Sequence, residues 1–148
     1  MSATGLDAAA GEPDPRVVEL AHQVLALART GETALLTQAL DVGVPRDLSD
    51  PQGNSLLMLA AYHGHAAATR LLAERGADVD RLNDRGQSPL AGAVFKGEDE
   101  VVRVLLTHGA DPDLGTPSAR DAAVVFGRPE LVPPPDDPTG PPPGTNHA

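Results

Sequence analysis

The pattern of apolar and polar positions along the chain repeats every 33 residues. Residues 50–82 read DPQGNSLLMLAAYHGHAAATRLLAERGADVDRL, and residues 83–115 read NDRGQSPLAGAVFKGEDEVVRVLLTHGADPDLG. Eleven of the 33 aligned positions are identical without a gap, whereas unrelated segments of ordinary composition share roughly three. A fixed period of this length predicts a solenoid, in which each unit buries its apolar face only against its neighbours.

Each copy of the repeat carries the start and stop signals of two short helices. A serine can cap the start of the first helix, because its hydroxyl accepts a hydrogen bond from a free backbone amide. A glycine then ends that helix, apolar residues at helical spacing form the second one, and a further glycine ends it. These positions are Ser55, Gly64 and Gly76 in the earlier copy and Ser88, Gly97 and Gly109 in the later one.

The same shift extends the pattern to both sides, giving repeats at about 16–49, 50–82 and 83–115 and a partial repeat at 116–132. Asp14 and Pro15 form a cap and first position for a long first helix, and the prolines at 133–135 limit the last helix to about one turn. We therefore predict a repeat domain over residues 15–132. The flanking tails, 1–14 and the Pro-rich 133–148, are expected to be disordered, with a ligand for a Pro-reading domain as the alternative for the second.

These residues resemble the ankyrin repeat, whose pattern runs Gly, Thr-Pro-Leu-His with Ala following, a Gly turn, a Leu-rich second helix and Gly-Ala-Asp. The later copy carries Gly86, Ser88-Pro89-Leu90, Ala93, Gly97, Leu105-Leu106 and Gly109-Ala110-Asp111. The chain departs from the pattern where Leu56 replaces the Pro, and where Met58 and Ala91 replace the His that ties neighbouring turns. The resemblance implies an all-α solenoid of about three and a half helix-turn-helix repeats with projecting loops.

Composition narrows the function classes. The chain has no Cys, which excludes disulfides and thiolate metal sites. Its first residues lack the basic start and apolar run of a secretory signal, and no stretch of about 18 apolar residues occurs. We therefore expect a cytoplasmic protein with no membrane contact, and the bias toward Ala, Gly, Pro and Arg suggests a bacterial genome.

The net charge of −10 bears on the partner. Residues 16–131 hold 16 acids against 11 bases, and an acidic body disfavours nucleic acid, because binding there depends on neutralising phosphates. Mimicry of nucleic acid is the sharper alternative, but the Arg residues interspersed among the acids argue against it. We expect a monomer that binds a protein partner and no nucleic acid.

No motif for catalysis or a cofactor stands out. The chain has no Gly-rich phosphate loop and no recognisable nucleophile with a base and an orienting group. His63-Gly64-His65 has a metal-like spacing, but a zinc site needs three or four ligands. We therefore expect no catalytic residue, no cofactor and no metal. A small metal-binding or enzyme-accessory protein using His63 and His65 is the alternative.

The resemblance implies binding through the loop tips and the inner helices, by an adaptor, inhibitor or stabiliser that is not an enzyme. Carried over onto this sequence, the partner-binding residues are Pro51, Gln52, Asn54, Tyr62, His63, Leu82, Asp84, Arg85, Gln87, Phe95, Lys96 and Phe126.

The three aromatic residues sharpen this prediction. Tyr62 and Phe95 are 33 residues apart, and Phe126 falls one step from the equivalent place in the last half-repeat. Every aromatic thus lies at the end of a predicted inner helix. One interpretation is a stripe of anchors for a partner, since aromatics are common hot-spot residues. The other is that the rings fill gaps between adjacent inner helices, and both remain open on the sequence alone.

Overall fold

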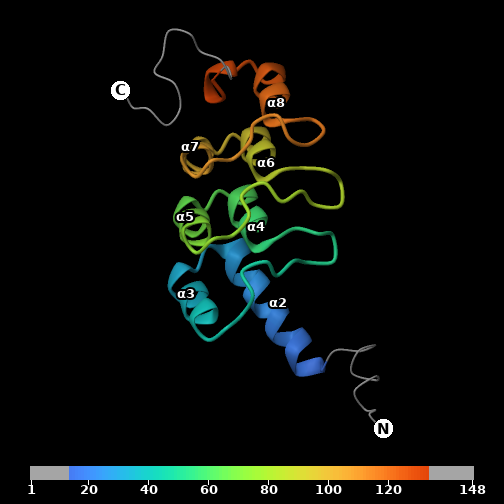
Figure 1. Ribbon diagram of the computed structural model, residues 1–148, viewed down its shortest axis with the longest axis vertical. Coiled ribbons are helices and arrows are strands. Elements are labelled where there is room, and N and C mark those ends of the chain that lie inside the picture. The colour runs from blue at the N-terminus through green and yellow to red at the C-terminus, as the bar shows by residue number, and fades with distance from the viewer. Residues whose placement is uncertain (1–13, 134–148) are drawn as a thin grey trace.

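The computed structural model describes residues 14–133, which form seven α-helices and one 3-10 turn and contain no extended strand. The helices stack in pairs along one axis, and the loops between pairs project from one edge (Figure 1). The predicted all-α solenoid of three and a half repeats is confirmed. The elements are α2 (Pro15–Thr30), α3 (Thr33–Asp41), α4 (Leu56–Tyr62), α5 (Ala66–Glu74), α6 (Pro89–Lys96), α7 (Asp99–Thr107), α8 (Ala119–Val125) and η1 (Pro129–Leu131).

The predicted caps set the helix boundaries. The hydroxyls of Ser55 and Ser88 each accept a hydrogen bond from the backbone amide three residues later, at 3.1 and 3.0 Å. Ser118 does the same at the start of α8, at 3.1 Å. Gly97 ends α6 in the left-handed conformation, with φ of 74°, which glycine adopts without the steric penalty of a side chain. Local sequence therefore defines where each short helix begins and ends.

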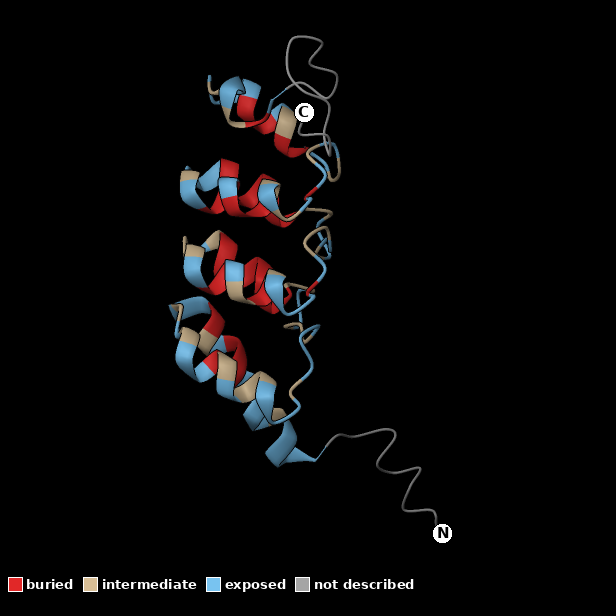
Figure 2. Cartoon of the chain, turned by 60° about the vertical axis from the view of Figure 1, so that its left-hand side comes forward, coloured by how far each residue is buried: buried red, intermediate tan, exposed pale blue. Residues whose placement is uncertain are grey.

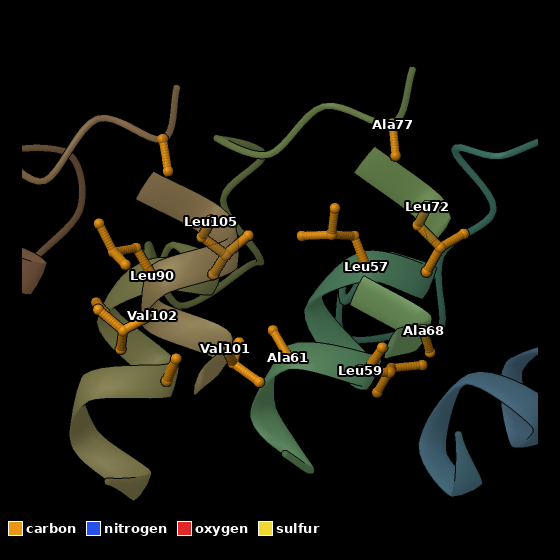
Figure 3. Close-up of a cluster of buried hydrophobic side chains, with 14 of the residues drawn as sticks. Leu57, Leu59, Ala61, Ala68, Leu72, Ala77, Leu90, Val101, Val102 and Leu105 are labelled. Carbon is orange, nitrogen blue, oxygen red and sulfur yellow. The ribbon is translucent and has the colours of Figure 1, made fainter. Parts of the chain in front are cut away.

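The helices form two layers. The inner layer holds α2, α4, α6 and α8, and the outer layer holds α3, α5 and α7. Leucines from both layers fill the space between them and are at most 1% exposed, among them Leu57, Leu72, Leu90 and Leu105. Figures 2 and 3 show this buried seam running along the stack. The buried hydrophobic residues form one cluster from Val24 to Val132, so the core is continuous.

The two ends of the stack differ from the middle. Helix α2 has 16 residues, against seven in α4 and eight in α6, and the Asp14 side chain caps it by accepting from the amide of Arg16 at 2.8 Å. The last predicted helix is a single 3-10 turn of three residues. The tails predicted at the two ends lie outside the described residues, apart from Asp14 and Pro133. No helix within residues 14–133 combines the length and the apolar character needed to cross a membrane.

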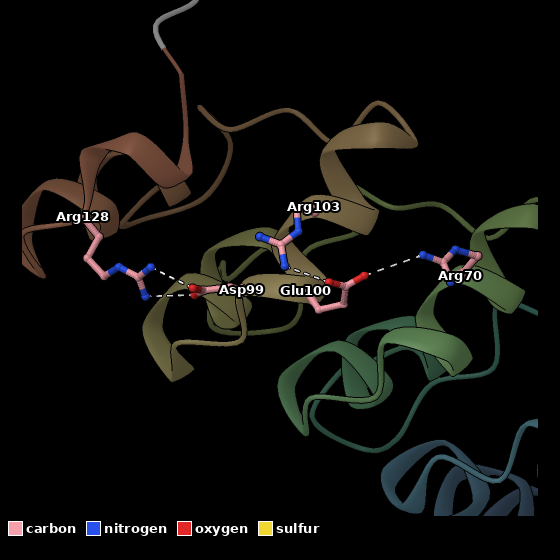
Figure 4. A network of polar contacts seen from close by, with 5 residues as sticks. All are labelled: Arg70, Asp99, Glu100, Arg103 and Arg128. Carbon is pink, nitrogen blue, oxygen red and sulfur yellow. Dashed lines mark hydrogen bonds and ion pairs between the residues drawn. The ribbon is translucent and has the colours of Figure 1, made fainter.

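Ion pairs link the outer elements of neighbouring repeats (Figure 4). Arg128, just before η1, holds the Asp99 carboxylate through two hydrogen bonds of 2.9 and 2.7 Å. Glu100 pairs with Arg103 on its own helix at 2.8 Å and lies 3.9 Å from Arg70 of α5. The Arg128 guanidinium lowers the pKa of Asp99, and Arg103 lowers the pKa of Glu100. These contacts tie one repeat to the next on the side away from the loops.

Candidate functional site

A groove of about 940 Å³ lies between the projecting loops and the inner helices. Four successive repeats contribute to it, so it extends along the stack. Ten of the twelve predicted partner-binding residues line it: Pro51, Gln52, Asn54, Tyr62, His63, Asp84, Arg85, Gln87, Phe95 and Phe126. The structure thus brings most of the predicted residues into one place, and their role in binding stays a prediction.

Residues of three inner helices form the floor of the groove. Ala91 and Gly92 of α6 lie there with Met58 of α4 and Ala122 of α8. A Cβ atom added to Gly92 would come 3.3 Å from Met58 Cε and 3.4 Å from Tyr62 Cδ1. The missing side chain at Gly92 therefore lets the Tyr62 ring and the Met58 thioether approach the neighbouring helix.

The aromatic residues divide between the two interpretations. Phe95 and Phe126 remain 60% and 49% exposed, and their rings meet edge to face with centroids 5.5 Å apart. Tyr62 is half-buried against the α6 backbone, and the Lys96 ammonium lies 4.5 Å from its ring centroid, which is a cation–π geometry. Tyr62 therefore fills a gap between helices, as the packing interpretation has it. The Phe95–Phe126 pair presents its rings to the groove, as the anchor interpretation requires.

The loop rim of the groove is held by side-chain amides. The Asn83 Nδ2 amide donates to Asn54 Oδ1 at 2.8 Å and to Gln87 Oε1 at 2.9 Å. Its Oδ1 accepts from the backbone amides of Arg85 and Gln87, each at 3.0 Å. Asp50 has the equivalent role in the preceding repeat, where it accepts from the amides of Gln52 and Asn54. Neighbouring loops are thus linked although the ankyrin His is absent.

Three positive side chains at the groove have no polar partner among the described residues. All eleven Lys and Arg residues of the chain lie within residues 14–133. Six of them pair with carboxylates and two donate to backbone carbonyls. The remaining three are Arg29 and Arg85, which line the groove, and Lys96 at its edge. The free cations of the described chain therefore gather at one site.

The two histidines with metal-like spacing serve different purposes. The His65 ring donates from Nε2 to the backbone carbonyl of Arg29 at 2.7 Å, which ties the second repeat to the first. His63 points into the groove and meets the Tyr62 ring edge to face. Burial lowers the pKa of His63, and the charges of Lys96, His65 and Arg29 add to this effect. Residues 14–133 contain no group of three or more His, Asp or Glu side chains arranged to hold a metal.

Two predicted residues do not line the groove, and several lining residues were missed. Leu82 is 40% exposed and is not among the lining residues, and Lys96 reaches the groove only through the Tyr62 ring. Arg29 was missed, although the 33-residue shift that relates Tyr62 to Phe95 also leads back to it. The other missed lining residues are Asp50, Met58, Leu59, Asn83, Ala91, Gly92, Pro117, Ala122 and Val125.

Stacked helix pairs, loops along one edge and a groove between loops and inner helices define a repeat solenoid with one grooved face. The chain belongs to the ankyrin-repeat family, because the family model for ankyrin repeats (three copies) matches residues 21–116. Ankyrin repeats are generally protein–protein interaction modules.

Individual relatives match over a fraction of their length. The chain is similar to ankyrin repeat protein PA3287 of Pseudomonas aeruginosa, with 48% identity over 60 residues, which is 40% of this chain and 35% of the relative. It is similar to ankyrin repeat domain-containing protein 29 of Homo sapiens, with 44% identity over 62 residues, and to that of Danio rerio, with 42%. Those matches cover 41% of this chain and 21% of each relative. The chain thus spans about a third or less of the curated relatives it matches.

Proposed function

We propose that this chain is a non-catalytic binding module, an adaptor, inhibitor or stabiliser, that holds a protein partner in the groove. The observation that carries the proposal is the exposed Phe95–Phe126 pair, in a groove that also has the unpaired cations Arg29 and Arg85 in its lining and Lys96 at its edge. Aromatic and Arg side chains are the residues that most often dominate binding at protein interfaces. Exposed rings of this size are unfavourable in water, so a partner that covers them gains free energy.

The geometry of the groove favours an extended segment of a partner. Its walls are rigid, since the inner helices pack on a continuous core and the loop rim is bonded through Asn83. The rim offers backbone and amide groups at the loop tips, and the floor offers apolar surface. An elongated ligand can use both along several repeats, which explains why the lining comes from four of them.

The test is capture of a partner by variants of the full chain. We expect Phe95→Ala combined with Phe126→Ala to weaken capture from a lysate of the source cells by about thirtyfold, the equivalent of about 2 kcal/mol for hot-spot residues. Circular dichroism should remain helical, because both rings are largely exposed. The matched control is Val17→Ala with Val42→Ala, which removes apolar groups that are 58% and 81% exposed outside the groove.

Two results would count against this proposal. Equal capture by the groove variant and the control would mean that the partner binds elsewhere. Loss of helical signal in the groove variant would mean that the ring pair holds the fold, as the packing interpretation has it. Titration of the purified partner then separates direct binding from capture through a larger complex.

A further inference from the structure

We propose that the groove is occupied in the free protein by residues 134–148 of the same chain. In this arrangement the prolines of the segment lie on the aromatic rings, and Asp136 and Asp137, three and four residues after Pro133, face Arg85 at the rim. The inference rests on the proposed function, because the segment would compete with the proposed partner for the same groove.

The charges of the groove favour an acidic occupant. Arg29, Arg85 and Lys96 have no polar side-chain partner within residues 14–133, in a chain whose net charge is −10. The rim also carries two carboxylates, but Asp50 already accepts bonds from the amides of its own loop. The groove therefore holds two carboxylates, Asp50 and Asp84, against three unpaired cations, so its local charge is positive. A segment with two acids and no Lys or Arg complements this surface.

The rings of the groove favour proline. Residues 134–148 read PPDDPTGPPPGTNHA and hold six prolines. Such a sequence prefers the extended polyproline II conformation, which binds aromatic-lined grooves at little cost in conformational entropy. Tyr62, Phe95 and Phe126 supply such a lining, with Pro117 beside them. The occupant thus matches the site in shape as well as in charge.

The segment begins at α8, which contributes to the groove, and is long enough to cross it. The Pro133 carbonyl accepts a hydrogen bond of 2.7 Å from Arg120 near the start of α8, and Ala122 of the same helix lines the groove. Neighbouring helices pack about 10 Å apart, so the path from α8 to α4 is about 20 Å. Fifteen residues in polyproline II conformation span about 46 Å. Pro141–Pro143 can therefore reach the Tyr62 end.

Such docking would set a threshold for the partner. A tethered segment competes at an effective concentration in the millimolar range. If the segment binds with a dissociation constant of about 0.1 mM, a ligand that needs the same groove binds about tenfold more weakly. Only a partner with matching chemistry and higher affinity would displace it.

The experiment uses Tyr62 fluorescence in the full chain, because Tyr62 is the only tyrosine and there is no tryptophan. One variant is Asp136→Asn with Asp137→Asn, and another replaces Pro141, Pro142 and Pro143 by Ser. We expect acrylamide quenching of Tyr62 to rise about twofold in both, since the docked segment covers the ring at a high effective concentration. The control, Asp7→Asn with Glu12→Gln, changes the net charge equally at the other end and should leave quenching unchanged.

Addition of a peptide of residues 133–148 supplies the second arm. It should restore the protection of Tyr62 in the proline variant and bind that variant about tenfold more tightly than the unchanged chain. Salt should remove the protection in the unchanged chain, because exposed charge pairs are screened. Equal quenching in all these proteins overturns the inference. Protection that grows with protein concentration also overturns it, because the occupant would then come from a second copy.

The two proposals fail in different ways. If partner capture depends on Phe95 and Phe126 while the segment variants alter neither quenching nor capture, the inference fails and the proposed function stands. If the segment protects Tyr62 but no captured protein depends on the two rings, the proposed function fails and the intramolecular docking stands.

Discussion

The groove face and the outer face of the stack both carry Arg side chains, but these side chains make different contacts on the two faces. On the outer face, Arg75, Arg103 and Arg128 each pair with a carboxylate at 2.7 or 2.8 Å. At the groove, Arg29 and Arg85 have no such partner among the described residues. Exposed pairs contribute little stability each, but they fix how neighbouring repeats lie. The difference is that the charges of the outer face are paired within the chain, whereas the groove face keeps cations without a partner in residues 14–133.

Apolar side chains also differ between the two regions. The leucines that join the two helix layers are fully buried, whereas the larger Phe95 ring is 60% exposed. Burial, and not the size of the side chain, determines the contribution to folding. Stability therefore comes mainly from the seam between the layers, and the exposed rings of the groove contribute less to it.

The largest expected effect tests this division of roles. Leu105 of α7 is 0% exposed, so Leu105→Ala should lower the free energy of unfolding by about 2–5 kcal/mol, through lost burial and a residual cavity. Phe95→Ala removes a larger side chain but should cost about 1 kcal/mol or less, mainly through the lost edge-to-face contact with Phe126. Urea denaturation followed by circular dichroism measures both. Equal losses for the two variants would show that the groove rings belong to the core.

A smaller effect is expected at the loop rim. Asn83→Ala removes an amide that makes four hydrogen bonds. With a net value of about 1 kcal/mol for a typical bond, and with water able to replace some of them, the cost should be about 1–2 kcal/mol in urea denaturation. Asn83→Asp is the matched variant, since it keeps the acceptor for the backbone amides and loses the two donors. We expect Asn83→Asp to lower the free energy of unfolding by roughly half as much as Asn83→Ala does. Equal losses for the two variants would show that only the two hydrogen bonds donated by the Asn83 amide contribute to stability.

The sequence was sufficient to predict the repeat, the caps and the order of the helices. Those features depend on local chemistry, such as the Ser88 hydroxyl at a helix start and the positive φ of Gly97, and the 33-residue period repeats them. The form of the last element was predicted less well. Its shortness followed from the prolines after Val132, but the sequence did not distinguish an α-helical turn from the 3-10 turn that lies against α8.

The site was predicted in outline because the period places equivalent residues side by side. What the sequence did not show is how the rings orient. Tyr62 turns onto Gly92, a residue whose importance is visible only once α4 and α6 are adjacent. The pattern of unpaired cations was equally inaccessible, since it requires knowing which of the other arginines find carboxylates. Ring orientation and ion pairing depend on contacts between side chains of neighbouring repeats, and the sequence pattern does not specify those contacts.

The floor of the groove offers a near-neutral test. Gly92→Ala gains about 1 kcal/mol from helix propensity, but the new methyl group meets Met58 Cε at 3.3 Å and Tyr62 Cδ1 at 3.4 Å. We expect the two effects nearly to cancel, so that the free energy of unfolding changes by less than about 1 kcal/mol. The Tyr62 ring should nevertheless move, and its fluorescence should change. A clear gain in stability with unchanged fluorescence would show that the floor is loosely packed.

The smallest expected effect concerns how the stability of the fold depends on pH. The Arg128 hydrogen bonds lower the pKa of Asp99 in the folded protein, so the unfolded chain binds a proton at this carboxyl at a higher pH than the folded one. The pair therefore stabilises the fold above the ordinary carboxyl pKa, and this contribution is lost as the pH falls through the lowered value. Asp99→Asn should lower the Tm slightly at pH near 6 and bring no further loss in strong acid. Asp84→Asn, which removes a carboxylate of the groove rim with no ion pair in residues 14–133, is the control. Equal pH profiles for the two variants would show that the outer pair contributes nothing, and that the contrast between the faces is one of geometry without an energetic consequence.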